Sequence, residues 1–286
     1  MSRSFFSAAC LLLATQTDAK MTEAPYFYRT DRPLVIAHRG SSGHFPEHSL
    51  GGYTDAYYGG TDFIELDLQV TKDGQLVAQH DSYLNDSTDV LQYESLFGDK
   101  VHRDGKYYVE DFTLQELKLL KRKQRYTFRS PLLNDKFEIL TLQEVINNVN
   151  LLVTDAPRTE NTGTTVGLYI ELKDFNSYLS KGIDMAELMN DILVANSLGT
   201  ISDCQDTMPI IVQSFDFEAL ERYAELSDLP LIQLAHWGDE YLYDWDKISQ
   251  VAHGCGPDSR LVFKTDYKAD EFVKNSVPNE YSDFIT

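Results

Sequence analysis

The chain has 286 residues, of which 42% are hydrophobic, so it is long enough to bury a large core as one big domain or two small ones. Its 45 acidic residues outnumber its 25 basic ones, which gives a formal net charge of −20. This charge argues against a nucleic acid or an anionic membrane surface as partner, because both repel an acidic protein.

The opening residues have the pattern of a secretory signal peptide. An early cation at Arg3 precedes an apolar stretch at residues 5–14 and small residues at positions 17 and 19. The apolar stretch is too short to span a bilayer, and it lacks the polar alternation of a helix packed on a core. We therefore expect residues 1–19 to be a signal peptide that directs residues 20–286 to the endomembrane lumen or the cell exterior.

Short apolar runs of the kind that form buried parallel strands recur along the rest of the chain. Nearly continuous Val/Ile/Leu runs are expected where a strand is covered on both faces. The candidate strands are LVIAH (34–38), FIELDLQV (63–70), QLVAQH (75–80), GLYIELK (167–173), PIIVQSF (209–215) and LPLIQLA (229–235), with SRLVF (259–263) a weaker candidate.

Segments with helical periodicity lie between these runs. Residues 47–60 predict a helix that ends at Gly59 and Gly60, and residues 182–199 and 216–228 predict two more. This alternation of strands and helices is typical of a (β/α)8 barrel or of an open doubly wound sheet.

Residues 82–135 interrupt the alternation with polar and aromatic sequence, and we interpret them as an insertion over one face of the barrel domain. A capping box from Thr113 to Glu116 predicts a basic helix over residues 113–125. A second box, from Thr141 to Glu144, marks the return to regular structure.

Charged side chains lie two residues apart on two of the expected strands. Glu65 and Asp67 point to the same side of one strand, and Glu171 and Lys173 repeat the spacing on another. Two carboxylates on one inward face repel each other unless a cation or a shared proton is present. One such pair alone would suggest a strand with a solvent face. Pairs on two buried-type strands favour a site for one divalent cation, Ca²⁺ or Mg²⁺, at Glu65, Asp67 and Glu171.

Two histidines end expected strands. His38, followed by Arg39, ends one strand, and His80 ends another, at the edge where barrels place their active sites. A lone histidine at a strand end is more often structural. Two of them beside a metal can act as acid and base, while Arg39 and Lys173 suit the oxygens of a phosphate.

Three more side chains follow later strands and are placed to line the same pocket. They are Gln213, Phe215 and Trp237, for which ordinary packing is the alternative.

The motifs AHRGSSGHFPEHSLGGY, TDFIELDLQVTKDGQLVAQHD, LNDSTDV, YIELK and VQSFD follow one another in this order. Together they resemble the glycerophosphodiester phosphodiesterase family, of the secreted or periplasmic type, over residues 34–258. The resemblance implies an α/β fold, a (β/α)8 TIM barrel, and hydrolysis of small-molecule glycerophosphodiesters to sn-glycerol 3-phosphate and an alcohol. It implies no protein partner.

By matched position, the resemblance implies that His38 and His80 are the acid–base pair and that Arg39 and Lys173 hold the phosphate. It likewise implies that the three carboxylates hold the metal. Glu47 matches a further motif, where we expect it to orient the loop. His48 stands where an Asn is common, and we assign it no chemistry.

The C-terminal end departs from the family pattern, which closes with a further strand and a Thr-Asp-x-Pro ending. Thr265 and Asp266 are not followed by that proline, and no strong apolar strand comes after them. We therefore expect a barrel that lacks its last one or two strands. A weakly active enzyme and a non-catalytic, phosphodiester-binding relic are the resulting alternatives. Retention of all the polar site positions argues against decay by substitution, but not against decay by deletion.

A related barrel enzyme of the phospholipase D toxin type is a further alternative. It also uses two histidines and a carboxylate-bound metal. The intact YIELK and TKDG signatures favour the glycerophosphodiesterase over it.

Overall fold

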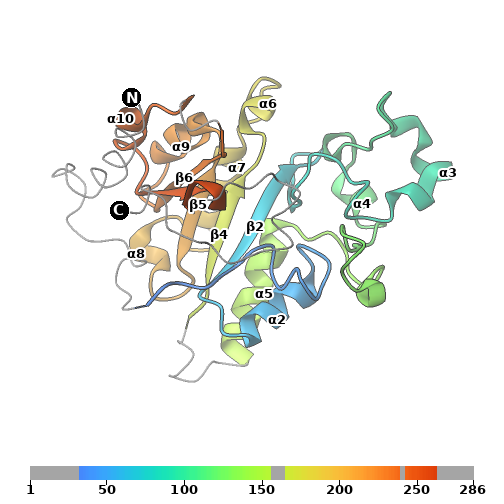
Figure 1. The fold of residues 1–286 in the computed structure, drawn as a ribbon, viewed down its shortest axis with the longest axis horizontal. Coiled ribbons are helices and arrows are strands. Elements are labelled where there is room, and N and C mark those ends of the chain that lie inside the picture. Colours follow the sequence, from blue (N-terminus) through green and yellow to red (C-terminus); the bar gives the residue numbers. More distant parts are fainter. Residues whose placement is uncertain (1–31, 156–164, 239–241, 263–286) are drawn as a thin grey trace.

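The computed structural model describes residues 32–155, 165–238 and 242–262, and its centre is a curved sheet (Figure 1). Parallel strands run in the order β1-β2-β4-β5-β6-β7, and β3 pairs with β2 off this path. The strands are β1 (Ile36–Ala37), β2 (Phe63–Val70), β3 (Leu76–Ala78), β4 (Gly167–Leu172), β5 (Ile210–Ser214), β6 (Leu231–Ala235) and β7 (Gly254–Pro257). No strand in the described ranges joins β7 to β1, so the sheet is an open part of a (β/α) barrel, as the sequence predicts.

Helices cover the outer face of this sheet (Figure 1). The longer ones are α2 (Leu50–Tyr58), α5 (Leu142–Asp155), α7 (Met185–Ala195) and α9 (Phe217–Ala224). Shorter ones are α3 (Glu94–Phe97), α4 (Leu114–Leu117), α6 (Phe175–Leu179), α8 (Ile201–Cys204), α10 (Trp245–Ile248) and α11 (Ser259–Val262). Among the described residues, none of the helices combines the length and the apolar character that crossing a membrane would require. The predicted signal peptide and residues 263–286 lie outside the described ranges.

The two faces of β2 separate the core from the site. Ile64, Leu66 and Leu68 point outward and join the main core with the covering helices. Phe63 points into the barrel, where it packs with apolar residues of the neighbouring strands in a small interior cluster. Glu65, two residues along, therefore faces the barrel interior above an apolar layer.

Three predicted helices are confirmed where local signals define them. Ser49 caps α2 by accepting a hydrogen bond from the Gly52 NH, and Gly59 is its C-terminal cap. Asp184 caps α7 in the same way. The helix α9 lies within its predicted range. In α2 and α7 the caps and the apolar periodicity are close in sequence, so no distant contact is needed to specify these two helices.

The prediction of parallel pairing for the third apolar run is wrong. β3 is antiparallel to β2, with Leu76 opposite Val70 and Ala78 opposite Leu68. The connection between them is a tight turn, closed by the Thr71 NH donating to the Gln75 carbonyl. A turn of this length can join only antiparallel strands, because a parallel connection needs a crossover of a dozen or more residues.

The end of the described chain also differs from prediction. The sequence predicts a weaker candidate strand at residues 259–263, whereas Ser259–Val262 form the short helix α11. The seventh strand of the sheet is instead β7, which has no apolar run and pairs in parallel with β6. A Cβ on Gly256 would lie 2.6 Å from Cδ2 of Leu234, so glycine at this position lets the Leu234 side chain keep its place.

Residues 82–135 lie to one side of the sheet and contain α3, α4 and several single turns (Figure 1). They have a hydrophobic cluster of their own, which includes Phe97, Phe112 and Leu120. The capping box at Thr113 is present, but the predicted helix over 113–125 ends at Leu117. Beyond it, the main chain of Arg122 pairs with Thr88 in an antiparallel bridge. This long-range pairing overrides the local helical tendency.

Candidate active site

A sharp turn after β1 brings His38 and Arg39 to the mouth of the barrel. Arg39 and Gly40 both have left-handed backbone angles, with φ of 60° and 76°. The Gly40 NH donates to the Ala37 carbonyl, and a Cβ on Gly40 would lie 2.9 Å from the Gly52 carbonyl carbon. Glycine is therefore required at this position, and the close approach of α2 fixes the turn.

A cavity of about 970 Å³ opens at the carboxyl ends of the parallel strands. The predicted site residues that line it are His38, Arg39, Glu65, His80, Glu171, Lys173, Gln213 and Phe215. Asp67 is fully buried beside them. Trp237 is not among the lining residues: its side chain is half exposed, and its ring lies 4.8 Å from the Arg260 guanidinium carbon.

Three carboxylates converge at the base of this cavity. Glu65, Asp67 and Glu171 each offer an oxygen, and these oxygens lie within 4.8 Å of one another. The register of the sheet explains the convergence, because Asp67 on β2 lies directly opposite Glu171 on β4. Gln213 on β5 is opposite Glu171 in turn, and its amide nitrogen lies 3.4 Å from Glu65 Oε1.

The carboxylates are not electrostatically equivalent. Burial, together with the charges of the other two, raises the pKa of Glu65 well above its usual value. Burial and the charge of Asp67 likewise raise the pKa of Glu171 to about 8, even though Lys173 lies 2.9 Å away. Burial also opposes ionisation of Asp67, but the hydrogen bond from His48 and nearby positive charges hold its pKa well below the usual range. Without a cation, the three groups cannot all be charged.

The residues present fit a divalent cation. Oδ1 of Asp67 is buried and accepts no hydrogen bond, which leaves a lone acceptor facing its carboxylate neighbours. Three carboxylate oxygens without Cys or His among them are the ligands that hard cations such as Ca²⁺ and Mg²⁺ prefer. Glu65, Asp67 and Glu171 would hold the ion.

The two predicted acid–base histidines have different surroundings. Burial and the charge of Arg39 lower the pKa of His38 to about 4, so its imidazole is neutral at neutral pH. Nδ1 of His80 lies 2.7 Å from Oδ1 of Asp81, the next residue in the chain. That contact leaves Nε2 of His80 as the nitrogen available to a substrate in the cavity.

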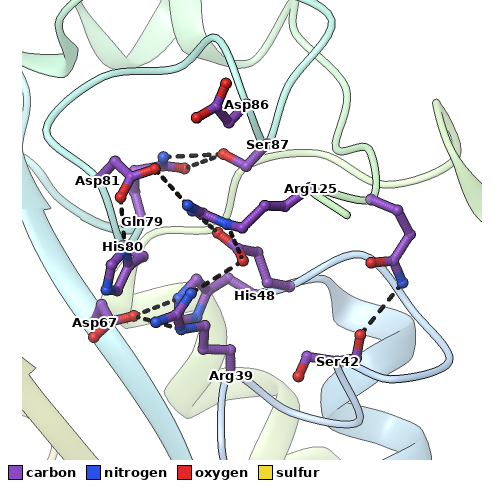
Figure 2. Close-up of polar contacts among 12 residues, drawn as sticks. Arg39, Ser42, His48, Asp67, Gln79, His80, Asp81, Asp86, Ser87 and Arg125 are labelled. Carbon is purple, nitrogen blue, oxygen red and sulfur yellow. Dashed lines mark hydrogen bonds and ion pairs between the residues drawn. The ribbon is translucent and has the colours of Figure 1, made fainter. Parts of the chain in front are cut away.

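Sequence reasoning missed the charged residues that surround these groups. Figure 2 shows Arg125 between Asp81 and the segment of His48. Arg125 forms ion pairs with Glu47, which is buried, and with Asp81. Asp81 had a usable signal, because an acid directly follows a candidate catalytic histidine. Arg125 had none, since it lies at the end of the segment whose pattern predicts a basic helix.

Comparison with known proteins assigns the chain to a family. The glycerophosphoryl diester phosphodiesterase family model matches residues 38–275. The chain belongs to this family. A glycerophosphodiester phosphodiesterase of Haemophilus influenzae is 32% identical over 88% of this chain and 76% of its own length. One of Arabidopsis thaliana is 35% identical over 72% of this chain, which spans 56% of that longer protein.

Solved structures of glycerophosphoryl diester phosphodiesterases have the same fold. A putative member from Silicibacter pomeroyi matches with a TM-score of 0.53 and 21% identity, over 75% of this chain and 68% of its own. An Oleispira antarctica phosphodiesterase, in complex with the product sn-glycerol-3-phosphate, matches with a TM-score of 0.51 and 24% identity, over 75% and 72%. At these identities the likeness establishes the fold.

Proposed function

We propose that the chain hydrolyses glycerophosphodiesters to sn-glycerol 3-phosphate and an alcohol, with one divalent cation bound by Glu65, Asp67 and Glu171. The observation that carries this proposal is the convergence of two histidines, two basic side chains and three carboxylates on one cavity. A phosphodiester anion that enters a protein of net charge −20 needs positive charge at its binding site. Arg39 and Lys173 supply it, and the names of the curated relatives point to the same substrate class.

His38 and His80 divide the proton transfers between them. His38 is neutral, and its role is to accept the proton of the attacking oxygen. His80, held by Asp81, donates a proton from Nε2 to the leaving alcohol oxygen as the bond from phosphorus to that oxygen breaks. A new phosphorus–oxygen bond forms on the opposite side, so one proton is taken up and one is released in each turnover.

The remaining side chains hold the phosphate while its charge develops. Arg39 offers a planar donor fork, and Lys173 a single ammonium at the floor of the cavity. A bound divalent cation would supply further stabilisation of the phosphoryl oxygens. The Lys173 ammonium lies over the Phe215 ring, 5.7 Å from the ring centre, and the ring limits the positions that the lysine side chain can adopt.

The test is a product assay on glycerophosphocholine, glycerophosphoethanolamine and glycerophosphoinositol, with phosphorus NMR to identify the product. The proposal expects sn-glycerol 3-phosphate from at least one of them, and none when a chelator is present. Release of the alcohol phosphate instead would assign the chain to a different bond cleavage. Turnover of sphingomyelin in place of these substrates would favour the phospholipase D toxin type.

We further propose that the chain enters the secretory route, on the pattern of residues 1–19 alone. Expression of the full chain in a cell that secretes proteins should yield a product that begins at residue 20. Mass spectrometry of the exported protein measures this directly, and a cytosolic product that still begins at Met1 would contradict it.

A further inference from the structure

All three guanidinium nitrogens of Arg125 contact carboxylate oxygens. Its Nε and Nη2 donate to the two carboxylate oxygens of Glu47, at 2.9 and 2.6 Å. Its remaining terminal nitrogen, Nη1, lies 2.7 Å from Oδ2 of Asp81. The Arg125 side chain is only 13% exposed. One side chain therefore joins two carboxylates, Glu47 from the loop after β1 and Asp81 from the loop after β3, and Figure 2 shows its contact with Asp81.

Each of these carboxylates contacts a residue of the proposed machinery. Asp81 uses its other oxygen to bind Nδ1 of His80, at 2.7 Å. Glu47 accepts a hydrogen bond from Nη1 of Arg39, at 3.2 Å, while the Arg39 main-chain NH donates to Glu65. Arg125 is thus linked through Asp81 to His80, the proposed acid, and through Glu47 to Arg39, which we propose binds the phosphate.

The segment that carries Arg125 is fixed on both sides. The amide of Gln124 donates to the Phe45 carbonyl at 2.6 Å, which ties it to the loop of Glu47. Arg122 is fully buried and donates to Gln79 and to the Ala78 carbonyl, which ties it to β3 just before His80. The main chain next to Arg125 is therefore fixed to the loop of Glu47 and to the strand before His80, which holds the guanidinium in place.

We propose that Arg125 is a positioning residue of this active site, which holds His80 through Asp81 and Arg39 through Glu47 in one fixed arrangement. The inference rests on the proposed function. It assigns to residues 82–135 a part in catalysis beyond covering the barrel. Lysine can replace Arg125 only in part, because a single ammonium cannot bind one carboxylate in a bidentate manner and a second one along its remaining edge.

The experiment compares steady-state kinetics of the full chain and its variants on glycerophosphocholine, with saturating Ca²⁺ or Mg²⁺. Arg125→Met should lower kcat by about 10- to 100-fold, the usual cost of removing a group that orients a functional ligand. Arg125→Lys should lie between Met and the parent. The matched control is Arg129→Met, which removes an arginine of the same region that donates to the Ser42 carbonyl and to no site carboxylate. It should stay within about twofold of the parent.

A double-mutant cycle separates positioning from a general loss of structure. If Arg125 acts in part through His80, then Arg125→Met should lower kcat by a smaller factor in the His80→Ala background than in the parent, because only the contribution through Arg39 remains. An equal loss in both backgrounds would overturn the inference, as would a parental kcat for Arg125→Met. Parental turnover by His80→Ala itself would instead refute the proposed acid–base pair. If Arg125→Met does not fold by circular dichroism, Asp81→Asn takes its place with the same cycle and the same expected results.

Discussion

Nε2 of His48 lies 2.9 Å from Oδ2 of Asp67, and both side chains are completely buried. Burial lowers the pKa of His48, so the imidazole is neutral and has one NH to donate. It donates that NH to the charged Asp67, and Nδ1 then accepts from the Tyr53 hydroxyl, also at 2.9 Å. One carboxylate of the triad is thereby kept ionised and fixed in orientation before any cation arrives.

Metal removal should abolish activity. Glu65 and Glu171 have raised pKa values in the absence of a cation, so the triad is stable as a charged cluster only when one is bound. We expect EDTA to stop the release of sn-glycerol 3-phosphate and Ca²⁺ or Mg²⁺ to restore it. Zn²⁺ should restore it poorly, since no Cys or His takes part in this oxygen cluster. Undiminished turnover by exhaustively chelated protein would show that activity does not depend on a metal at this site.

Loss of either proposed acid–base histidine should slow chemistry without abolishing binding. His38→Ala and His80→Ala should each lower kcat by about 10² to 10⁴, the usual range for a general acid or base. Binding of a non-hydrolysed phosphodiester, measured by calorimetry, should survive because Arg39 and Lys173 remain. His44→Ala is the matched control, since His44 lies in the same loop but is largely exposed. Parental kcat in either test variant would remove that residue from the mechanism.

The contact between His48 and Asp67 should be worth about 10- to 100-fold in metal affinity, as is typical of groups that orient a metal ligand. His48→Leu removes the donor but keeps most of the volume, so we expect weaker Ca²⁺ or Mg²⁺ binding by calorimetry. His48→Asn keeps an NH donor and should recover part of the affinity. If both variants bind the cation as tightly as the parent, then Asp67 does not depend on His48 for its orientation.

Acid should weaken the fold through Glu47. Burial opposes its ionisation, but the hydrogen bonds and charge of Arg125 lower its pKa to about 2, against about 4.3 in an unfolded chain. A lowered folded pKa contributes stability that is fully present above the unfolded value and is lost as pH falls toward the folded one. Glu47 should therefore contribute up to about 3 kcal/mol to the free energy of unfolding above pH 5, declining toward pH 2.

Urea unfolding of the parent chain and of Glu47→Gln between pH 7 and pH 3 measures this contribution. The difference in free energy between the two proteins should shrink as the pH falls. A difference that stays constant over this range would show that the charge of Glu47 is not its source.

The parts of the fold that local sequence specifies were predictable. β2 and β4 are runs of apolar residues that alternate with the charged residues of the site, and α2 and α7 have caps within a few residues of their periodic segments. The antiparallel direction of β3 was also predictable, because only a short turn separates residues 70 and 76; the apolar run alone suggested a parallel strand. β7 was missed for a different reason. Its sequence, GCGP, forms a strand only because β6 provides its main-chain partners.

The residues of the candidate site also differ in whether a local sequence pattern reveals them. Glu65 and Asp67 are recognisable from their spacing on one strand, since alternation alone puts both on one face. Arg125 was not recognisable, because its partner Glu47 lies 78 positions earlier in the chain. His48 was passed over as a substitute for Asn, although it binds Asp67. Contacts between distant loops depend on the folded barrel, and no local pattern in a single sequence carries them.

The most direct test of the central claim is the time course of sn-glycerol 3-phosphate release from glycerophosphocholine by the full chain, run beside Asp67→Asn. Asn keeps the volume of Asp67 and removes its charge from the triad. We expect metal-dependent release by the parent and at least a hundredfold slower release by Asp67→Asn, the scale of losing a main electrostatic contributor. Equal rates for the two proteins, or no release by the parent with any of the three glycerophosphodiesters, would contradict the account.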